Sequence, residues 1–426
     1  MKHPFLAALA VALAALLLHA CGGGGGSSPP PSPEATLAAT IRSDTRLASV
    51  RAKARQLAAG SLAAGSGYPA VFIRDLNTFL ALAIEAQGPQ KVREYLELFL
   101  AHQGADGNIA DGIALLDGAT FKGTVESDQE SSLVQAVAKY VAATGDTAFL
   151  TQSVAGVPVI VRLENALNFL YSQRYAAAYG LVWGGTRADW GDVQPEDVPG
   201  VDLSDASHPA ISIYDNAMLS LALADLQSLE GAIARDASAW AAKRTALRAA
   251  VRTHLWTGTQ FIPHVYLEKG SPFPASFDES RIYFQGGTAV AIQAGMLEEA
   301  EVLQAFARMV RNKVDSGSAS VGVSLYPAYP AGFFANTEYM GSEYFYQNGG
   351  DWPWFGARIV QQMVAHGQVA QAYQEIGPML DRVVRDNGFY EWYTREGAPR
   401  GSAEYRGTAG EIAKAIDLLL AWAAAH

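Results

Sequence analysis

The sequence predicts an all-α fold in which helical hairpins form a ring and long loops meet on one face. Apolar residues recur at three- and four-residue spacing in many Ala- and Leu-rich segments, which is typical of amphipathic helices. Gly88, Gly145 and Gly295 lie where such segments should end. The connections between the helix pairs are long and rich in Gly, Pro, Asp and aromatic residues, and loops of this length are usually functional.

The elements follow in order from this pattern. Helices are expected at residues 37–60, 75–87, 89–103, 129–144, 147–174, 214–229, 231–254, 285–296, 297–314, 354–366, 367–384 and 406–425. The long connections are 104–125, 180–213, 257–284, 315–353 and 386–405, and short strands are expected at 258–267 and 320–326.

Composition narrows the class of protein. The chain has 426 residues and a net charge of -11, with no visible basic patch, so we expect no nucleic-acid partner. Its single cysteine excludes disulfides within the chain and a thiolate metal cluster. The 8 histidines show no metal-ligand spacing, and no zinc-protease, Walker A or nucleophile-elbow motif is present. We therefore expect neither a metal nor an organic cofactor.

The first residues indicate export rather than folding. Residues 1–20 combine a basic start with an apolar run too short to span a bilayer, which predicts a signal peptide. The segment resembles a bacterial lipoprotein signal, which implies a lipid anchor on Cys21 and, with Gly22 next, sorting to the outer membrane. An incidental cysteine after an ordinary signal peptide is the alternative. Residues 21–36 form a Gly/Ser/Pro linker, and 37–426 one domain.

Two acidic clusters occur at predicted helix starts. Arg74 and Asp75 open the helix near residue 75, where the helix dipole would stabilise the carboxylate or where Asp75 could bind sugar hydroxyls. Asp128 precedes the helix at 129–144, within Glu126-Ser127-Asp128-Gln129-Glu130. It is either a helix cap or an acid that points into a cleft.

Two further clusters combine Trp with Gly and Asp in long loops. Trp183–Asp192 contains Asp189, Trp190 and Asp192, which could stack on a sugar and bind its hydroxyls. A calcium loop is the competing interpretation, but the spacing lacks an EF-hand pattern. Tyr346–Trp354 contains Asn348 and Trp352 beside an Asn-Gly-Gly turn that allows close backbone approach.

The last cluster, Phe389-Tyr390-Glu391-Trp392-Tyr393, surrounds a carboxylate with aromatic rings. Carbohydrate-cleaving sites need this combination, because the rings stack on the sugar while the carboxylate activates water. A packed helix start would explain the same residues without function. Glu404, which begins Glu404-Tyr405-Arg406-Gly407-Thr408, is a second candidate.

Together, over residues 70–425, these clusters resemble the six-hairpin (α/α)6 glycosidases, in particular alkaline/neutral invertases and the glucosidase (amylo-α-1,6-glucosidase) domain of glycogen-debranching enzymes. The resemblance implies an (α/α)6 toroid, with Asp128 as general acid and Glu391, or alternatively Glu404, as general base. The invertase Trp pair after the acid is replaced by Ser131 and Ser132, so sucrose specificity does not carry over.

The resulting expectation is an inverting exo-α-glycoside hydrolase that acts on an oligosaccharide or polysaccharide. Arg74, Asp75, Asp189, Trp190, Asp192, Asn348, Trp352 and Glu404 are the predicted substrate-binding residues. Two alternatives stay open: a phosphorylase on the same fold, with Arg395, Arg400 and Arg406 near Glu391 as phosphate ligands, and a surface lipoprotein that binds glycans without cleaving them. Localisation is expected in the cell envelope, through the anchor at Cys21.

Overall fold

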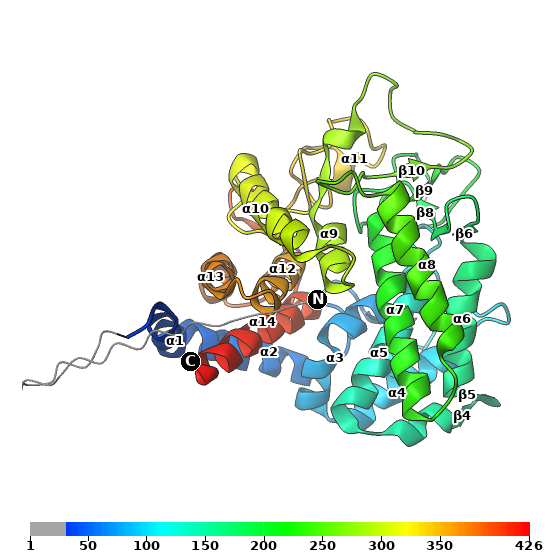
Figure 1. Ribbon diagram of the computed structural model, residues 1–426, viewed down its shortest axis with the longest axis horizontal. Helices are drawn as coiled ribbons and strands as arrows, with labels where there is room; N and C mark the ends of the chain where they lie inside the picture. The colour runs from blue at the N-terminus through cyan, green and yellow to red at the C-terminus, as the bar shows by residue number, and fades with distance from the viewer. Residues whose placement is uncertain (1–30, 199) are drawn as a thin grey trace, which may run out of the picture.

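The computed structural model describes residues 31–198 and 200–426, and helices dominate it (Figure 1). The predicted signal peptide and Cys21 lie outside the described residues, as does most of the predicted linker. Six helices form an inner layer: α3 (Ile73–Gln87), α5 (Gln129–Thr144), α7 (Ile213–Ala232), α9 (Gln285–Gln293), α12 (Pro353–Ala365) and α14 (Arg406–Ala425).

The inner helices form a closed ring. Each packs against the next in the order α3, α5, α7, α9, α12 and α14, and α14 returns to pack against α3. Each follows an outer helix in the chain: α2 (Thr45–Gly60), α4 (Pro89–Ala101), α6 (Val159–Gln173), α8 (Ser238–His254), α10 (Glu299–Ser316) and α13 (Val369–Arg385). In Figure 1, α10 and α13 lie outside α9 and α12. The predicted all-α toroid of helical hairpins is confirmed.

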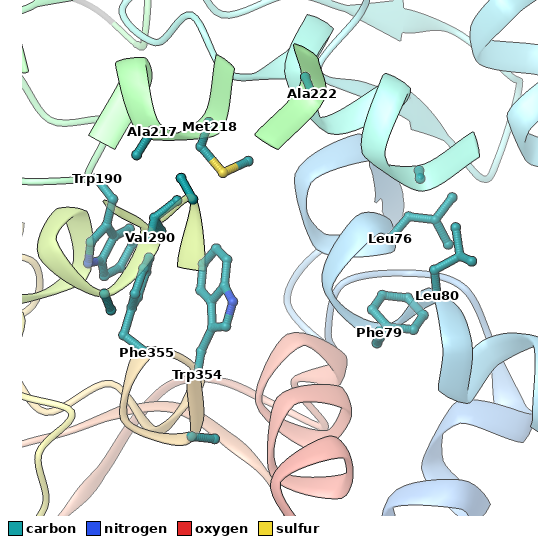
Figure 2. Close-up of a cluster of buried hydrophobic side chains, with 14 of the residues drawn as sticks. Leu76, Phe79, Leu80, Trp190, Ala217, Met218, Ala222, Val290, Trp354 and Phe355 are labelled. Atoms are coloured by element: carbon teal, nitrogen blue, oxygen red, sulfur yellow. The ribbon is translucent and has the colours of Figure 1, made fainter. Parts of the chain in front are cut away.

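Burial explains which helices lie inside. The first half of the inner helix α7, from Ile213 to Ser220, is buried on all sides, because the helix contacts two inner neighbours and its outer partners. The outer helix α13 instead alternates buried and exposed positions at helical spacing. Figure 2 shows aromatic side chains at the centre of the ring, where Trp190 stacks on Phe355 at 4.6 Å between ring centroids.

Short strands occur only in the connections among the described residues. They are β1 (Ala70–Phe72), β2 (Gly112–Ala114), β3 (Thr120–Phe121), β4 (Ser153–Val154), β5 (Val157–Pro158), β6 (Tyr175–Ala176), β7 (Leu181–Val182), β8 (Gly184–Gly185), β9 (Pro209–Ile211), β10 (Val265–Tyr266), β11 (Tyr283–Phe284), β12 (Leu325–Tyr326), β13 (Tyr390–Tyr393) and β14 (Pro399–Ala403). All pair antiparallel, in sheets of two or three strands that stiffen the long loops.

Three of the predicted helices differ from the structure. The segment 37–60 is divided at Asp44 into α1 (Pro33–Ser43) and α2, because the Asp44 carboxylate accepts the Arg46 N–H as the cap of α2. The segment 147–174 begins instead with a 3-10 turn at Thr147–Thr151 and the β4–β5 hairpin before α6. The helix expected at 231–254 begins only at Ser238.

The remaining boundaries agree closely with the sequence pattern. Residues 129–144 and the C-terminal helix from Arg406 are helical as predicted. Gly88, Gly145 and Gly295 do follow helix ends, each with a positive φ angle. The two expected strands are much shorter than predicted, since only β10 and β12 form within 258–267 and 320–326.

Candidate active site

Two adjoining cavities lie among the long connections. The inner pocket has a volume of about 190 Å³ and the outer cleft one of about 830 Å³. Both are lined by the same five residues, so the two cavities meet where these residues lie: Tyr68, Asp192, Val201, Tyr346 and Glu391. Asp192 and Glu391 are the two carboxylates at this junction.

The inner pocket is built at the N-terminal ends of the inner helices. Arg74 and Asp75 come from the first turn of α3, and Glu126 precedes α5. Trp352 and Tyr405 are the residues directly before α12 and α14. Unpaired backbone N–H groups at helix N-termini favour negative charge, so the ring itself supports a pocket with several carboxylates.

Glu391 is held at the junction by two hydrogen bonds. The Tyr68 hydroxyl donates to Oε1 at 2.9 Å, and the backbone N–H of Ser402 on the paired strand β14 donates to Oε2 at 2.7 Å. Burial raises the pKa of Glu391 to about 7, and the nearby Asp75 and Asp192 carboxylates act in the same direction. Gly401, with φ of 68°, leaves room for the carboxylate, which any side chain there would meet.

Asp192 forms two hydrogen bonds with Gln347, a residue in a loop far away in the sequence. The Gln347 side-chain amide donates to Oδ1 of Asp192 at 2.7 Å, and its carbonyl oxygen accepts the Asp192 backbone N–H at 3.2 Å. A side chain at Gly191 would collide with this amide. The carboxylate is partly exposed toward both cavities.

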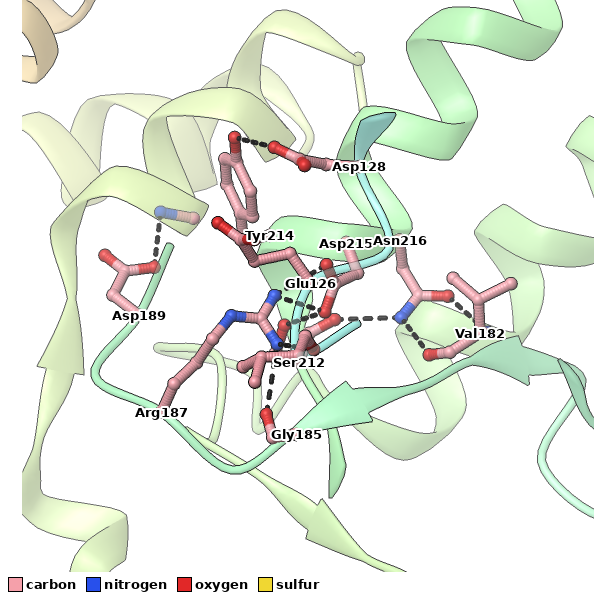
Figure 3. A network of polar contacts seen from close by, with 12 residues as sticks. Glu126, Asp128, Val182, Gly185, Arg187, Asp189, Ser212, Tyr214, Asp215 and Asn216 are labelled. Atoms are coloured by element: carbon pink, nitrogen blue, oxygen red, sulfur yellow. Dashed lines mark hydrogen bonds and ion pairs between the residues drawn. The ribbon is translucent and has the colours of Figure 1, made fainter. Parts of the chain in front are cut away.

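The loop that carries Asp192 is fixed to three inner helices (Figure 3). Arg187 pairs with Asp215 in the first turn of α7, with both carboxylate oxygens within 2.7 Å of Nη2. Asp189 accepts the backbone N–H groups of Gly286 and Gly287 at the start of α9, at 2.7 and 2.8 Å. Trp190 packs on α12 through its stacking on Phe355. The loop is therefore a rigid support for Asp192.

Asp128 occupies a different position from the one predicted for a general acid. Its side chain is fully buried, ion-paired with Nε of Arg74 at 2.9 Å, and accepts the Tyr214 hydroxyl at 2.8 Å (Figure 3). It does not line either cavity. Arg74 also pairs with Glu126, so its charge is shared between two buried carboxylates.

The other pocket carboxylates have perturbed ionisation. Burial raises the pKa of Asp75 to about 6, against the lowering effect of Arg74 and the Tyr405 hydroxyl. Burial also raises the pKa of Glu126, and that of Asp111, whose carboxylate accepts the Gly123 N–H at 2.7 Å. Such shifts are typical of functional sites.

The structure therefore brings six of the ten predicted residues together around the cavities: Arg74, Asp75, Trp190, Asp192, Trp352 and Glu391. Asp128 and Asp189 lie behind the walls. Asn348 is fully buried and exchanges hydrogen bonds with the Tyr329 backbone. Glu404 is exposed and lies beside Lys53 and Arg406 at a separate surface cavity.

Sequence reasoning missed several wall residues: Tyr68, Asp111, Tyr346, Gln347 and Tyr405. Tyr346, Gln347 and Tyr405 belong to motifs that the sequence singled out, but their roles depend on partners far along the chain. Asp111 and Tyr68 stand in loops with no local motif. The Glu391 partner Tyr68 is 323 positions away.

In residues 31–198 and 200–426, no helix has the length and apolarity needed to cross a bilayer. The same residues contain no group of three or more His, Cys, Asp or Glu side chains arranged to hold a metal ion.

The chain matches known proteins in structure. No protein-family profile and no curated protein sequence matches the chain. The GH63 mannosylglycerate hydrolase from Thermus thermophilus, solved with glucose, matches with a TM-score of 0.62 at 16% identity, over 87% of this chain and 99% of that one. The same enzyme solved with Tris and D-glycerate gives a TM-score of 0.63 over 86% of this chain.

The chain has the (α/α)6 fold of six helical hairpins. A second match of this fold is the GH78 rhamnosidase of Bacillus sp. GL1, with a TM-score of 0.60 at 16% identity, over 87% of this chain and 34% of that longer one. In the six-hairpin fold seen here, the loops before the inner helices carry the cavity walls. The predicted fold resemblance is thereby confirmed.

Proposed function

We propose that the protein is an inverting, exo-acting glycoside hydrolase in which Asp192 is the general acid and Glu391 the general base. The observation that carries the proposal is the position of these two carboxylates at the junction of a small inner pocket and a larger outer cleft. A terminal sugar in the inner pocket and a leaving group in the outer cleft would put the scissile bond between them. The fold shared with two glycoside hydrolases supports the class of enzyme.

The environment of Glu391 suits a general base, and Asp192 is held in place beside it. Glu391 has a pKa raised to about 7, which is well matched to accepting a proton from water near neutral pH. Its oxygens are held by Tyr68 and Ser402, so its orientation is fixed. Asp192, held by Gln347, would protonate the glycosidic oxygen as the bond breaks. Inversion requires space for a water molecule between base and sugar.

This assignment moves the acid from Asp128 to Asp192. A group that donates a proton to the leaving oxygen must reach the substrate, and Asp128 is enclosed by Arg74 and Tyr214. Asp128 would instead hold Arg74 at the pocket wall. For the base, Glu391 is preferred to Glu404 for the same reason.

A phosphorylase is disfavoured by the placement of the arginines. Arg406 is buried and donates to the Ala63 carbonyl, Arg400 donates to Pro399, and Arg395 lies over the Tyr344 ring. None of the three lines the inner pocket or the outer cleft. Phosphate would meet several carboxylates there and only one cation, Arg74.

Attachment to the outer membrane through a lipidated Cys21 is proposed from the sequence alone. Fractionation of cells that express the full chain tests it. Cys21→Ser should move the protein from the membrane pellet to the soluble fraction, whereas a wild-type chain found only in the soluble fraction would contradict the anchor.

Hydrolysis is tested on a panel of α-linked glucosides, mannosides, rhamnosides and maltooligosaccharides. We expect release of a terminal sugar from at least one member and loss of that release in Glu391→Gln. Glu404→Gln is the matched control and should retain it, because Glu404 lies outside both cavities. Binding of a glycan without release in the wild type would favour the non-catalytic alternative.

A further inference from the structure

The walls of the outer cleft carry four carboxyl groups and an excess of negative charge. Asp192, Glu196, Glu338 and Glu391 line it, and no lysine or arginine does so among the described residues. His208 pairs with Glu196 through Nδ1, at 2.5 Å from its Oε1. Opposed carboxylates at the mouth of a cavity focus a negative potential into it.

The one cation of the inner pocket does not change this balance. Arg74 is ion-paired with both Glu126 and Asp128, and Asp75 and Asp111 also line the same space. A negatively charged ligand would therefore find no free positive partner in either cavity, within the part of the chain that the structure describes.

The hydrogen-bonding character of the cleft points the same way. Ionised carboxylates only accept hydrogen bonds, and Oε2 of Glu196 is buried with no partner in the described structure. A carboxylate on the cleft wall is satisfied by a hydroxyl or ammonium donor and is left worse off beside another carboxylate or a phosphate.

Aromatic rings also line the outer cleft. Tyr339, Tyr346 and Trp392 line the cleft, and Tyr346 lies with its ring centroid 5.2 Å from that of Tyr339 and 5.9 Å from that of Trp392. Rings with an apolar face and a polar edge suit the hydrophobic face of a neutral sugar or polyol.

We propose that the outer cleft selects leaving groups that carry no negative charge, a neutral sugar or polyol, and excludes glycerate, uronate and phosphate leaving groups. This inference rests on the proposed function, since it takes the outer cleft as the leaving-group site. It separates this chain from the structurally similar Thermus enzyme, which was solved with D-glycerate.

The test compares two ligands that differ in one group. The first pair is glucosylglycerol and glucosylglycerate, both sulfur-linked so that they resist hydrolysis. The corresponding mannosyl and rhamnosyl pairs are also used. Calorimetry measures the binding of each ligand to the wild-type protein. We expect the glycerol member of a pair to bind at least about tenfold more tightly at low salt, and the gap to narrow at high salt because the charges are solvent-facing.

Variants assign the effect to the cleft. Glu338→Gln should improve glycerate-ligand binding about two- to threefold and change glycerol-ligand binding less, so that the gap between the two ligands narrows. Glu343→Gln, an exposed neighbour that does not line the cleft, should alter neither.

Equal or tighter binding of the glycerate members would overturn the inference, as would absence of binding by every pair. Preferential binding of the glycerol members, with no cleavage of any oxygen-linked substrate, would refute hydrolysis but leave the charge selection standing.

Discussion

At the scale of single residues, carboxylates that are close in sequence have separate environments. Asp192 reaches both cavities while Asp189, three residues earlier, caps α9. Glu391 reaches the junction, whereas Glu404, just after the same hairpin, is exposed elsewhere. Access to the cavities therefore decides which carboxylates can act on a substrate, and each role can be tested by exchanging the acid for its amide.

Asp192→Asn and Asp128→Asn should fail in different ways. Asp192→Asn should lower kcat/KM on the order of 10²–10⁴-fold with little change in stability, since Asp192 is partly exposed. Asp128→Asn removes a buried partner of Arg74 and should cost about 3 kcal/mol in the free energy of unfolding. Urea unfolding and steady-state kinetics on both variants check this. A stable Asp128→Asn without activity would return the acid role to Asp128.

The raised pKa of Glu391 predicts a pH dependence with a definite sign. The base must be ionised, so kcat/KM should fall as pH drops below about 7. For stability, the unfolded group titrates near 4.5 and the folded group near 7. The folded state thus binds more protons between these values, and this group's contribution to stability falls as pH rises through that window.

Glu391→Gln removes this penalty. It should therefore be more stable than the wild type at pH 8, by on the order of 1–3 kcal/mol, with the difference fading toward pH 4.5. Thermal unfolding of both proteins across pH measures it. A variant less stable than the wild type at pH 8 would show that the bonds to Tyr68 and Ser402 outweigh the cost of burying the charge.

The sequence predicts a pocket residue correctly where the local motif alone places that residue at the pocket wall. Arg74 and Asp75 lie at a helix start, where pocket walls form, and Trp190 and Asp192 share one dense Trp-Gly-Asp loop. It could not show which of Asp128 and Asp192 reaches the cavities, because the access of each carboxylate depends on contacts with distant parts of the chain. Only Tyr214 and Gln347, distant in sequence, distinguish them.

At the scale of elements, the loop before α7 is the part of the chain that positions Asp192, the proposed acid. Three contacts attach it to α7, α9 and α12. Asp189 has a left-handed φ of 54°, and Tyr346 has a φ of 46° in another loop at the site. Non-glycine residues keep such angles only where the surrounding structure enforces them. The conformation of these loops is therefore fixed by their contacts.

Asp189→Ala should loosen this loop. The change leaves two backbone N–H groups at the start of α9 without their acceptor, at a cost of about 1–3 kcal/mol. Activity should fall as well, since Asp192 is three residues away. Asp197→Ala, an exposed acid in the same loop, is the control and should change neither. Chemical denaturation and assays of both variants decide whether the cap matters.

The type of an element was predictable where the apolar residues kept a helical spacing over a long segment and the capping residues lay next to it in the sequence. The helices at 129–144 and 406–425 follow from their apolar spacing and flanking residues. The prediction for 147–174 was wrong because its apolar residues continue through the β4–β5 hairpin, whose turn at Ala155 and Gly156 requires positive φ at both positions. The two- and three-residue strands depend on distant partners and leave no pattern in the sequence.

At the scale of the whole molecule, the site depends on closure of the ring. Helix α14 packs against α1, α2, α3, α12 and α13, and so joins the two ends of the chain. It also carries Tyr405 at its start, against Asp75 on α3. Closure between the first and last inner helices is therefore a condition for the pocket.

Deletion of residues 406–426 should abolish cooperative unfolding, because every helix that packs on α14 would expose apolar surface. Deletion of residues 31–43, which removes only the peripheral α1, should preserve a single transition at lower temperature. Differential scanning calorimetry of the two truncated chains compares them. A cooperative transition without α14 would show that the ring is not one folding unit.

The central claim is that Asp192 and Glu391 cleave a glycoside with inversion across the junction of the two cavities. The most direct measurement follows the anomeric configuration of sugar released by residues 31–426 from an α-glycoside, by time-resolved proton NMR. The account predicts that the β-anomer appears first and that Asp192→Asn and Glu391→Gln each abolish its release. First appearance of the α-anomer, or release that survives either substitution, would contradict it.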